Sequence, residues 1–163
     1  KRPELRRLPK RADKLHVSES WNEMTDLQST IVAAARACLG TPFRHQGRAP
    51  GVALDCAGLA VVALKSAGVD IHAPANYSRT PHDGRLRAMI DLQRGLRFVP
   101  RDDMQAGDVL LIKIGNEPSH VGICTGGGNI IHAYEQVGKV VEHRLDAAWQ
   151  AQIVAVYRAE VAQ

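Results

Sequence analysis

Apolar positions in the first half of the chain recur with the period of a helix. Side chains three and four residues apart share one helix face, and this spacing predicts three helices: residues 26–38, 56–67 and 85–93. Thr25 or Asp26 is placed to cap the first of them. Each predicted helix stops at a glycine, the residue that most readily turns left-handed after a last turn: Gly40, Gly68 and Gly95.

The pattern changes after residue 107 to short apolar runs separated by turns. These runs predict five strands: residues 108–114, 120–125, 129–134, 139–145 and 153–158. Short links between the first four strands favour an antiparallel meander. Helices followed by strands predict an α+β fold, in which the N-terminal helices pack on one side of a five- to six-stranded, mainly antiparallel sheet.

The length of 163 residues suits one domain, predicted at residues 25–163, behind a basic arm or linker at residues 1–24. Residues 1–14 carry seven basic and two acidic side chains, so this stretch alone holds more than the whole net charge of +4. A solvated linker is the favoured interpretation, and an arm that binds an anionic polymer or a neighbouring protein is the alternative.

The sequence lacks the signals of a membrane span, of specific nucleic-acid binding and of a secretory signal peptide. The longest apolar run, residues 59–64, is far shorter than the ~20 residues of a membrane span. No motif that reads a nucleic acid is present, and a basic run alone indicates only non-specific phosphate affinity. The basic start is not followed by the apolar run of a secretory signal peptide.

Three cysteines at wide spacing, Cys38, Cys56 and Cys124, indicate neither a disulfide framework nor a zinc ribbon. Cys38 falls on the apolar stripe of the first helix and is interpreted as a small core residue. Cys56 comes where a loop rich in proline and glycine, residues 41–53, gives way to the second helix. Unpaired N–H groups and the helix dipole at this point favour a thiolate, so Cys56 is the candidate nucleophile of a thiol hydrolase.

A thiol nucleophile needs a base, and His120 and His132 are the best candidates among seven histidines. They lie on consecutive predicted strands joined by three glycines at residues 126–128. A loop with an odd number of residues puts both side chains on one face, whereas a two- or four-residue loop without a bulge separates them. Periodicity alone supports a site and two unrelated histidines equally. The polar neighbours of His143 predict that it lies at the surface.

Five motifs occur in a fixed order over about residues 27–158: Leu39-Gly40-Thr41-Pro42-Phe43-Arg44, Asp55-Cys56-Ala57-Gly58-Leu59, Gln105-Ala106-Gly107-Asp108-Val109, Ser119-His120-Val121-Gly122-Ile123 and Ile130-Ile131-His132-Ala133. With these motifs the chain resembles the NlpC/P60 family of papain-like cell-wall peptidases. The resemblance implies a papain-like fold in which Cys56 attacks an amide carbonyl, His120 transfers the proton and His132 orients His120. The backbone N–H of Cys56 would meet the oxyanion. No metal or cofactor is implied.

The resemblance also implies a group of residues near the substrate or the oxyanion: Phe43, His45, Asp55 and Ser119. The family usually has a tyrosine at the place of Phe43, and its hydroxyl points at the oxyanion region. Phe43 lacks this donor, and His45 is either its replacement or an ordinary loop histidine. Residues 69–84 and the turn at 115–118 are expected to border the cleft.

The sequence of residues 41–48 resembles that of the branch of the family found in bacteriophage tails. It implies an endopeptidase at the virion tail tip that cuts the peptidoglycan stem peptide, between D-Glu and the diamino acid, in the periplasm or cell wall. Tail-tip proteins are then possible partners of the basic arm. One alternative is a structural tail module with little or no activity. Another is a zinc site of Cys56, His120 and His132, with Cys124 at the same strand parity as His120.

Overall fold

A computed structural model describes residues 25–73, 75–79 and 83–161. The predicted basic arm, residues 1–24, lies outside the described residues. The helices are α1 (Asp26–Ala37), α2 (Cys56–Ser66), α3 (Arg85–Asp91) and α4 (Ala147–Gln152), with a 3₁₀ turn at Arg101–Asp103. The strands are β1 (Arg48–Ala49), β2 (Ala53–Leu54), β3 (Leu96–Val99), β4 (Val109–Ile114), β5 (Glu117–Gly126), β6 (Asn129–Tyr134), β7 (Lys139–Arg144) and β8 (Ile153–Ala159). Within these ranges, every helix is too short or too polar to cross a membrane.

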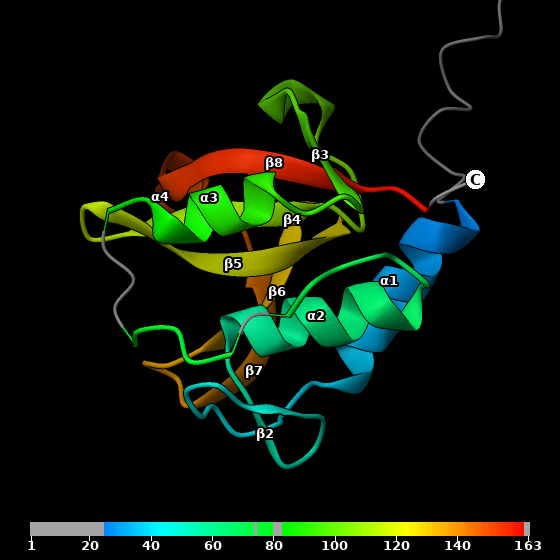
Figure 1. The fold of residues 1–163 in the computed structure, drawn as a ribbon. Coiled ribbons are helices and arrows are strands. Elements are labelled where there is room, and N and C mark those ends of the chain that lie inside the picture. Colours follow the sequence, from blue (N-terminus) through cyan, green and yellow to red (C-terminus); the bar gives the residue numbers. More distant parts are fainter. Residues whose placement is uncertain (1–24, 74, 80–82, 162–163) are drawn as a thin grey trace, which may run out of the picture.

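The main sheet has six strands in the order β3-β8-β4-β5-β6-β7, and every neighbouring pair is antiparallel. The predicted meander is therefore confirmed as β4 to β7, and β8 returns to lie between β4 and β3 (Figure 1). The α+β prediction is confirmed. The edge strand β3 was not predicted, because its four residues show no clear alternation and its pairing partner β8 lies more than fifty residues away.

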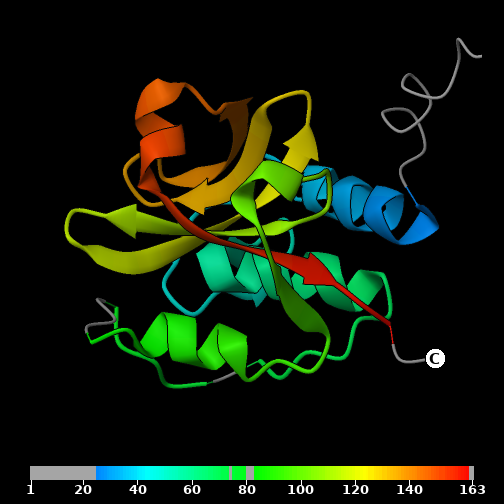
Figure 2. The same ribbon diagram turned by 90° about the horizontal axis from the view of Figure 1, so that it is seen from above.

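Two apolar cores lie on the two faces of the sheet. Residues of α1, α2 and α3 pack against one face, for example Ile31, Leu59 and Ile90. The other face is covered by a second cluster that includes Trp149 of α4. Figure 2 shows α4 at the end of the sheet formed by β6 and β7, away from the three N-terminal helices. The short helix α4 is an addition to the predicted fold.

The helix boundaries follow the sequence closely. Thr25 caps α1 through a capping box with Gln28, and Gly40 has the left-handed φ of 80° after the last turn. The helix α2 begins at Cys56, as predicted. The helix α3 ends at Asp91, two residues earlier than predicted, because a turn at residues 93–95 redirects the chain into β3.

The turn between β5 and β6 decides where His120 and His132 point. Only Gly127 and Gly128 lie between the two strands, but the register shifts between Cys124 and Gly126. This bulge adds the extra residue that a two-residue loop lacks. His120 and His132 therefore face the same side of the sheet, on adjacent strands.

Candidate active site

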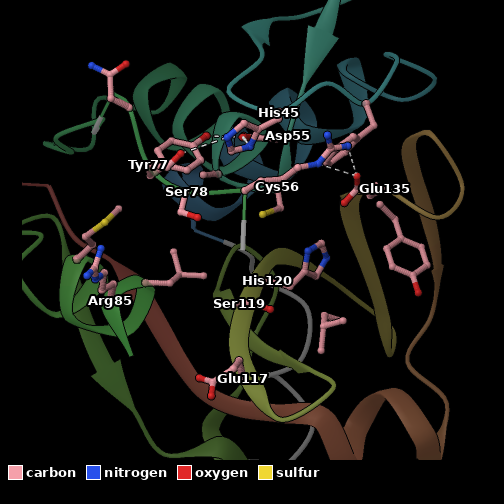
Figure 3. Close-up of a pocket in the computed structure, with 18 of the residues that line it drawn as sticks. His45, Asp55, Cys56, Tyr77, Ser78, Arg85, Glu117, Ser119, His120 and Glu135 are labelled. Atoms are coloured by element: carbon pink, nitrogen blue, oxygen red, sulfur yellow. Dashed lines mark hydrogen bonds and ion pairs between the residues drawn. The ribbon is translucent and has the colours of Figure 1, made fainter. Parts of the chain in front are cut away.

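Cys56 is the first residue of α2, and Asp55 is the N-cap. The Asp55 carboxylate accepts a hydrogen bond of 2.7 Å from the backbone N–H of Gly58. Backbone N–H groups in the first turn of a helix have no partner inside the helix, so those of Cys56 and Ala57 are available near the sulfur. Figure 3 shows the Cys56 sulfur turned toward the His120 ring.

Gly58 explains why the motif around Cys56 contains a glycine. A Cβ at this position would lie 2.0 Å from the carbonyl oxygen of Gly47, so no side chain fits. Gly47 is equally confined, since its Cβ would lie 2.7 Å from the backbone nitrogen of Leu54. The two glycines let the loop before β1 pack directly on the first turn of α2.

The Asp55 side chain also fastens two loops to the start of α2. It is 4% exposed. Besides Gly58 it accepts hydrogen bonds from the guanidinium of Arg48 at 2.9 Å and from the backbone N–H of Gln46 at 2.7 Å. The hydroxyl of Tyr77 is a further donor to it, and Arg48 donates to that hydroxyl at 2.7 Å. Tyr77 was missed from the sequence because nothing local marks one tyrosine in a loop as a partner of Asp55.

A cleft of about 580 Å³ opens beside Cys56. Its walls include six of the seven residues singled out from the sequence: Phe43, His45, Asp55, Cys56, Ser119 and His120. The predicted bordering loops are confirmed, since residues 75–79 and Glu117 line the cleft (Figure 3). His132 is fully buried and lies behind His120 rather than in the cleft.

A chain of three histidines leads away from Cys56 across strands β5, β6 and β7. His120 Nε2 lies 2.7 Å from His132 Nδ1, and His132 Nε2 lies 2.8 Å from His143 Nε2. His143 Nδ1 in turn lies 2.8 Å from the carbonyl oxygen of Arg144. The prediction that His120 and His132 share a face is confirmed. The prediction for His143 is wrong in one respect: the residue stays partly exposed, but its ring contacts His132 and so joins the site.

Aromatic rings enclose this chain of histidines. Tyr134 stacks on His132 with ring centroids 5.0 Å apart and an interplanar angle of 11°. Trp149 of α4 meets both His132 and His143 at 5.1 Å. The position of Trp149 is set by Asp146, the N-cap of α4, whose carboxylate accepts a hydrogen bond from the Trp149 backbone N–H. That cap is the signal in the sequence from which α4 was predictable.

Burial dominates the electrostatics of the site. It raises the pKa of the Cys56 thiol to about 11, against the opposing effect of backbone N–H groups of Val121, Ala57 and Cys56 itself. Burial lowers the pKa of His120 to about 4, and the charge of Asp55 opposes this shift. Burial and the two neighbouring histidines lower the pKa of His132 to about 3. At neutral pH the site therefore holds a neutral thiol beside a neutral imidazole that is able to accept its proton.

The remaining candidates lie around this pair. The backbone of Phe43 donates to the carbonyl of Gly138 at 2.8 Å, and its side chain packs against the first core. His45 Nε2 lies 3.2 Å from the carbonyl oxygen of Tyr77. Ser119 sits where the pairing of β4 and β5 shifts register. Their contacts with a substrate stay predictions. Among the described residues, no three His, Cys, Asp or Glu side chains are arranged to hold a metal.

Comparison with known proteins places these features in a family. Residues 40–158 match the model of the NlpC/P60 family. A probable endopeptidase of Corynebacterium glutamicum is 33% identical over 116 residues, which cover 71% of this chain and 47% of that protein. The gamma-D-glutamyl-L-lysine dipeptidyl-peptidase of Bacillus subtilis is 28% identical over 139 residues, which cover 83% of this chain and 40% of that protein. The chain thus spans less than half the length of these relatives.

Solved structures with a similar fold include peptidoglycan hydrolases. The peptidoglycan hydrolase RipB from Mycobacterium tuberculosis superimposes with a TM-score of 0.59 at 21% identity, over 84% of this chain and 65% of that chain. At this identity the likeness shows the fold. The family match, which covers most of the residues from the end of α1 to β8, shows more: this chain belongs to the NlpC/P60 family.

Proposed function

We propose that this chain is a cysteine endopeptidase that hydrolyses an amide bond in the stem peptide of peptidoglycan. The observation that carries the proposal is the placement of Cys56 and His120 together in the wall of one cleft, with His120 bonded at 2.7 Å to the buried His132. A nucleophile, a base and a group that orients the base are the parts that covalent amide hydrolysis requires.

In the first step, the Cys56 thiol gives its proton to His120 Nδ1 while the sulfur attacks the substrate carbonyl carbon. An S–C bond forms, and the carbonyl π electrons move to oxygen. The N–H groups at the start of α2 are placed to donate to this oxyanion, where preorganised donors contribute strongly in a cleft of low dielectric. The C–N bond then breaks, and His120 returns the proton to the leaving amine.

The second half of the reaction frees the thiol. A water molecule gives a proton to His120 and attacks the thioester carbon, and the S–C bond breaks. The proton on His120 returns to the sulfur, which leaves a carboxylic acid product and the resting enzyme. Neutral His120 is the required starting form in both halves, and its lowered pKa supplies that form at neutral pH.

The charges around the cleft support a short charged peptide as substrate. The lining includes side chains of both signs: Arg85 and Glu117, together with Arg79 and Glu135, which form an ion pair with each other. A stem peptide carries free carboxylates and, at a diamino acid, an ammonium group, so both signs have partners. The name of the Bacillus subtilis relative describes cleavage after γ-D-glutamate, and we propose the corresponding bond, between D-Glu and the diamino acid, for this chain.

Digestion of purified sacculi tests the proposal. The parent chain, a Cys56→Ala variant and a control Cys38→Ala variant are incubated with sacculi, and the products are identified by mass spectrometry. Cys38 is buried in the first core and lies outside the cleft lining, so it controls for the loss of a thiol. We expect stem-peptide fragments from the parent and the control only. If none of the three releases fragments, the proposal fails, and the alternative of a structural tail module with little or no activity takes its place.

We further propose that the enzyme is carried at the tip of a phage tail and acts on the cell wall during entry. The proposal is supported by the sequence of residues 41–48, which resembles that of the phage-tail branch, and by the basic residues 1–14. The positive charge of residues 1–14 suits contact with an acidic neighbour. The test is mass spectrometry and immunogold labelling of purified particles. Label at the tail tip is the expected result, and particles without this chain would contradict it.

A further inference from the structure

We propose that His143 is a positioning residue that sets the tautomer of His120 through His132, and so keeps His120 Nδ1 free to accept the Cys56 proton. The inference rests on the proposed function, because it assigns His120 the role of base. Its evidence is the order of donors and acceptors along three histidines and one backbone carbonyl.

The order is fixed at its far end by the carbonyl oxygen of Arg144. A carbonyl oxygen only accepts hydrogen bonds, so His143 Nδ1, 2.8 Å away, must carry a hydrogen. A neutral imidazole has one N–H group, which makes Nε2 of neutral His143 an acceptor. His132 Nε2 lies 2.8 Å from it and must therefore be the donor.

The same reasoning passes along the next bond. His132 Nε2 carries the only hydrogen of a neutral ring, so its Nδ1 is an acceptor. His120 Nε2 lies 2.7 Å from that atom and donates to it. The hydrogen of neutral His120 is then on Nε2, and Nδ1 has a free lone pair. The lowered pKa values of His120 and His132 agree with two neutral rings at neutral pH.

At the middle ring of the chain, the surroundings leave no room for other partners. His132 is fully buried between Tyr134 and Trp149, so water has little access to its ring. His132 and His143 are diagonal neighbours on one face, because His132 pairs with Val141 in the register of β6 and β7. No buried side-chain nitrogen or oxygen in the described ranges lacks a hydrogen bond. Reversing the order would put the hydrogen on His120 Nδ1, where it blocks proton transfer from Cys56.

Two substitutions separate positioning from simple support of the fold. His143→Gln keeps an oxygen that is able to accept from His132 Nε2, whereas His143→Leu keeps bulk and removes the acceptor. In His143→Leu the His132 N–H is left buried without a partner, and the reversed tautomer becomes competitive. We expect kcat/KM to fall about tenfold or more in His143→Leu and to stay within about threefold of the parent in His143→Gln.

Nitrogen-15 NMR of labelled histidines reads the tautomers directly and needs no substrate. In the parent at neutral pH we expect the Nε2–H tautomer for His120 and His132 and the Nδ1–H tautomer for His143. The same pattern for His120 is expected in His143→Gln, and loss of that pattern in His143→Leu. An Nδ1–H tautomer of His120 in the active parent would overturn the proposal. So would a His143→Leu variant that loses activity with His120 unchanged, since its role would then be structural.

The NMR result also separates this inference from the proposed function. If the parent cleaves no stem peptide, the proposed function fails while the tautomers are still measurable. If the parent cleaves stem peptides but the tautomer order differs from the one above, only the role of His143 is wrong.

Discussion

Removal of the Asp55 carboxylate perturbs more of this protein than removal of an ordinary helix cap. An N-cap is worth about 1 kcal/mol, and Asp55→Ala loses this contribution at α2. It also leaves the Gln46 N–H and the Tyr77 hydroxyl without their acceptor, at ~1–3 kcal/mol each. Arg48 is partly exposed and able to turn toward water, so we assign it no cost. The free energy of unfolding should fall by about 3–7 kcal/mol.

The Asn variant tests the same reasoning at constant shape. In Asp55→Asn one oxygen becomes an NH₂ group, and this donor faces either the Gly58 and Arg48 donors or the Gln46 N–H and the Tyr77 hydroxyl. We expect the free energy of unfolding to fall by about 2 kcal/mol, which places the Asn variant between the parent and the Ala variant in stability. Thr25→Ala is the matched control, because Thr25 caps α1 without holding a second loop, and it should cost only about 1 kcal/mol.

Urea unfolding followed by circular dichroism measures these differences. At 2–4 °C per kcal/mol for a chain of this size, Asp55→Ala should also lower Tm by about 6–28 °C. Activity should fall with stability, since the loops that Asp55 holds form one wall of the cleft. An Asp55→Ala variant no less stable than Thr25→Ala would refute the reasoning, because Asp55 would then be a cap and nothing else.

Three further predictions concern the glycine contact and the histidines. Gly58→Ala should abolish activity and lower the free energy of unfolding by about 2 kcal/mol or more, since its Cβ meets the Gly47 carbonyl at 2.0 Å; unchanged urea midpoints would contradict this. A pH series of kcat/KM should show activity rising with pH through about 4, where His120 loses its proton, and a limb near 7 would contradict the lowered pKa. His132 has a lowered pKa, so the unfolded chain takes up a proton that the folded chain does not, and stability is lost as pH falls from about 6.5 toward 3. His132→Asn should therefore flatten the fall in unfolding free energy by up to ~1.4 kcal/mol per pH unit in this window, and an unchanged slope would count against it.

Much of the fold follows from local signals in the sequence. The capping residue Thr25 and the glycines after α1 and α2 fix those helices, and the apolar runs fix β4 to β8 except at their first or last residues. β3 has no such signal, because its place at the sheet edge depends on pairing with β8. α4 has six residues, too few for a period, although Asp146 marks its start.

In the candidate site, too, local features were predictable from the sequence and features that depend on strand pairing were not. Cys56 was predictable because a helix start is a local feature, and the shared face of His120 and His132 was predictable only as a condition on the loop. The bulge near Gly126 that meets this condition is a property of strand pairing and has no signature in the sequence. His143 looked like a surface residue beside Glu142 and Arg144 because its partner is on another strand.

The most direct test of the central claim is to trap the covalent intermediate on Cys56. A soluble stem peptide is mixed with the protein and quenched in acid within milliseconds, and the protein is then digested and analysed by mass spectrometry. We predict that the peptide containing Cys56 gains the mass of the acyl half of the substrate, and that Cys56→Ala gives neither adduct nor product. Product formation without an adduct on Cys56, together with full activity of Cys56→Ala, would contradict the account.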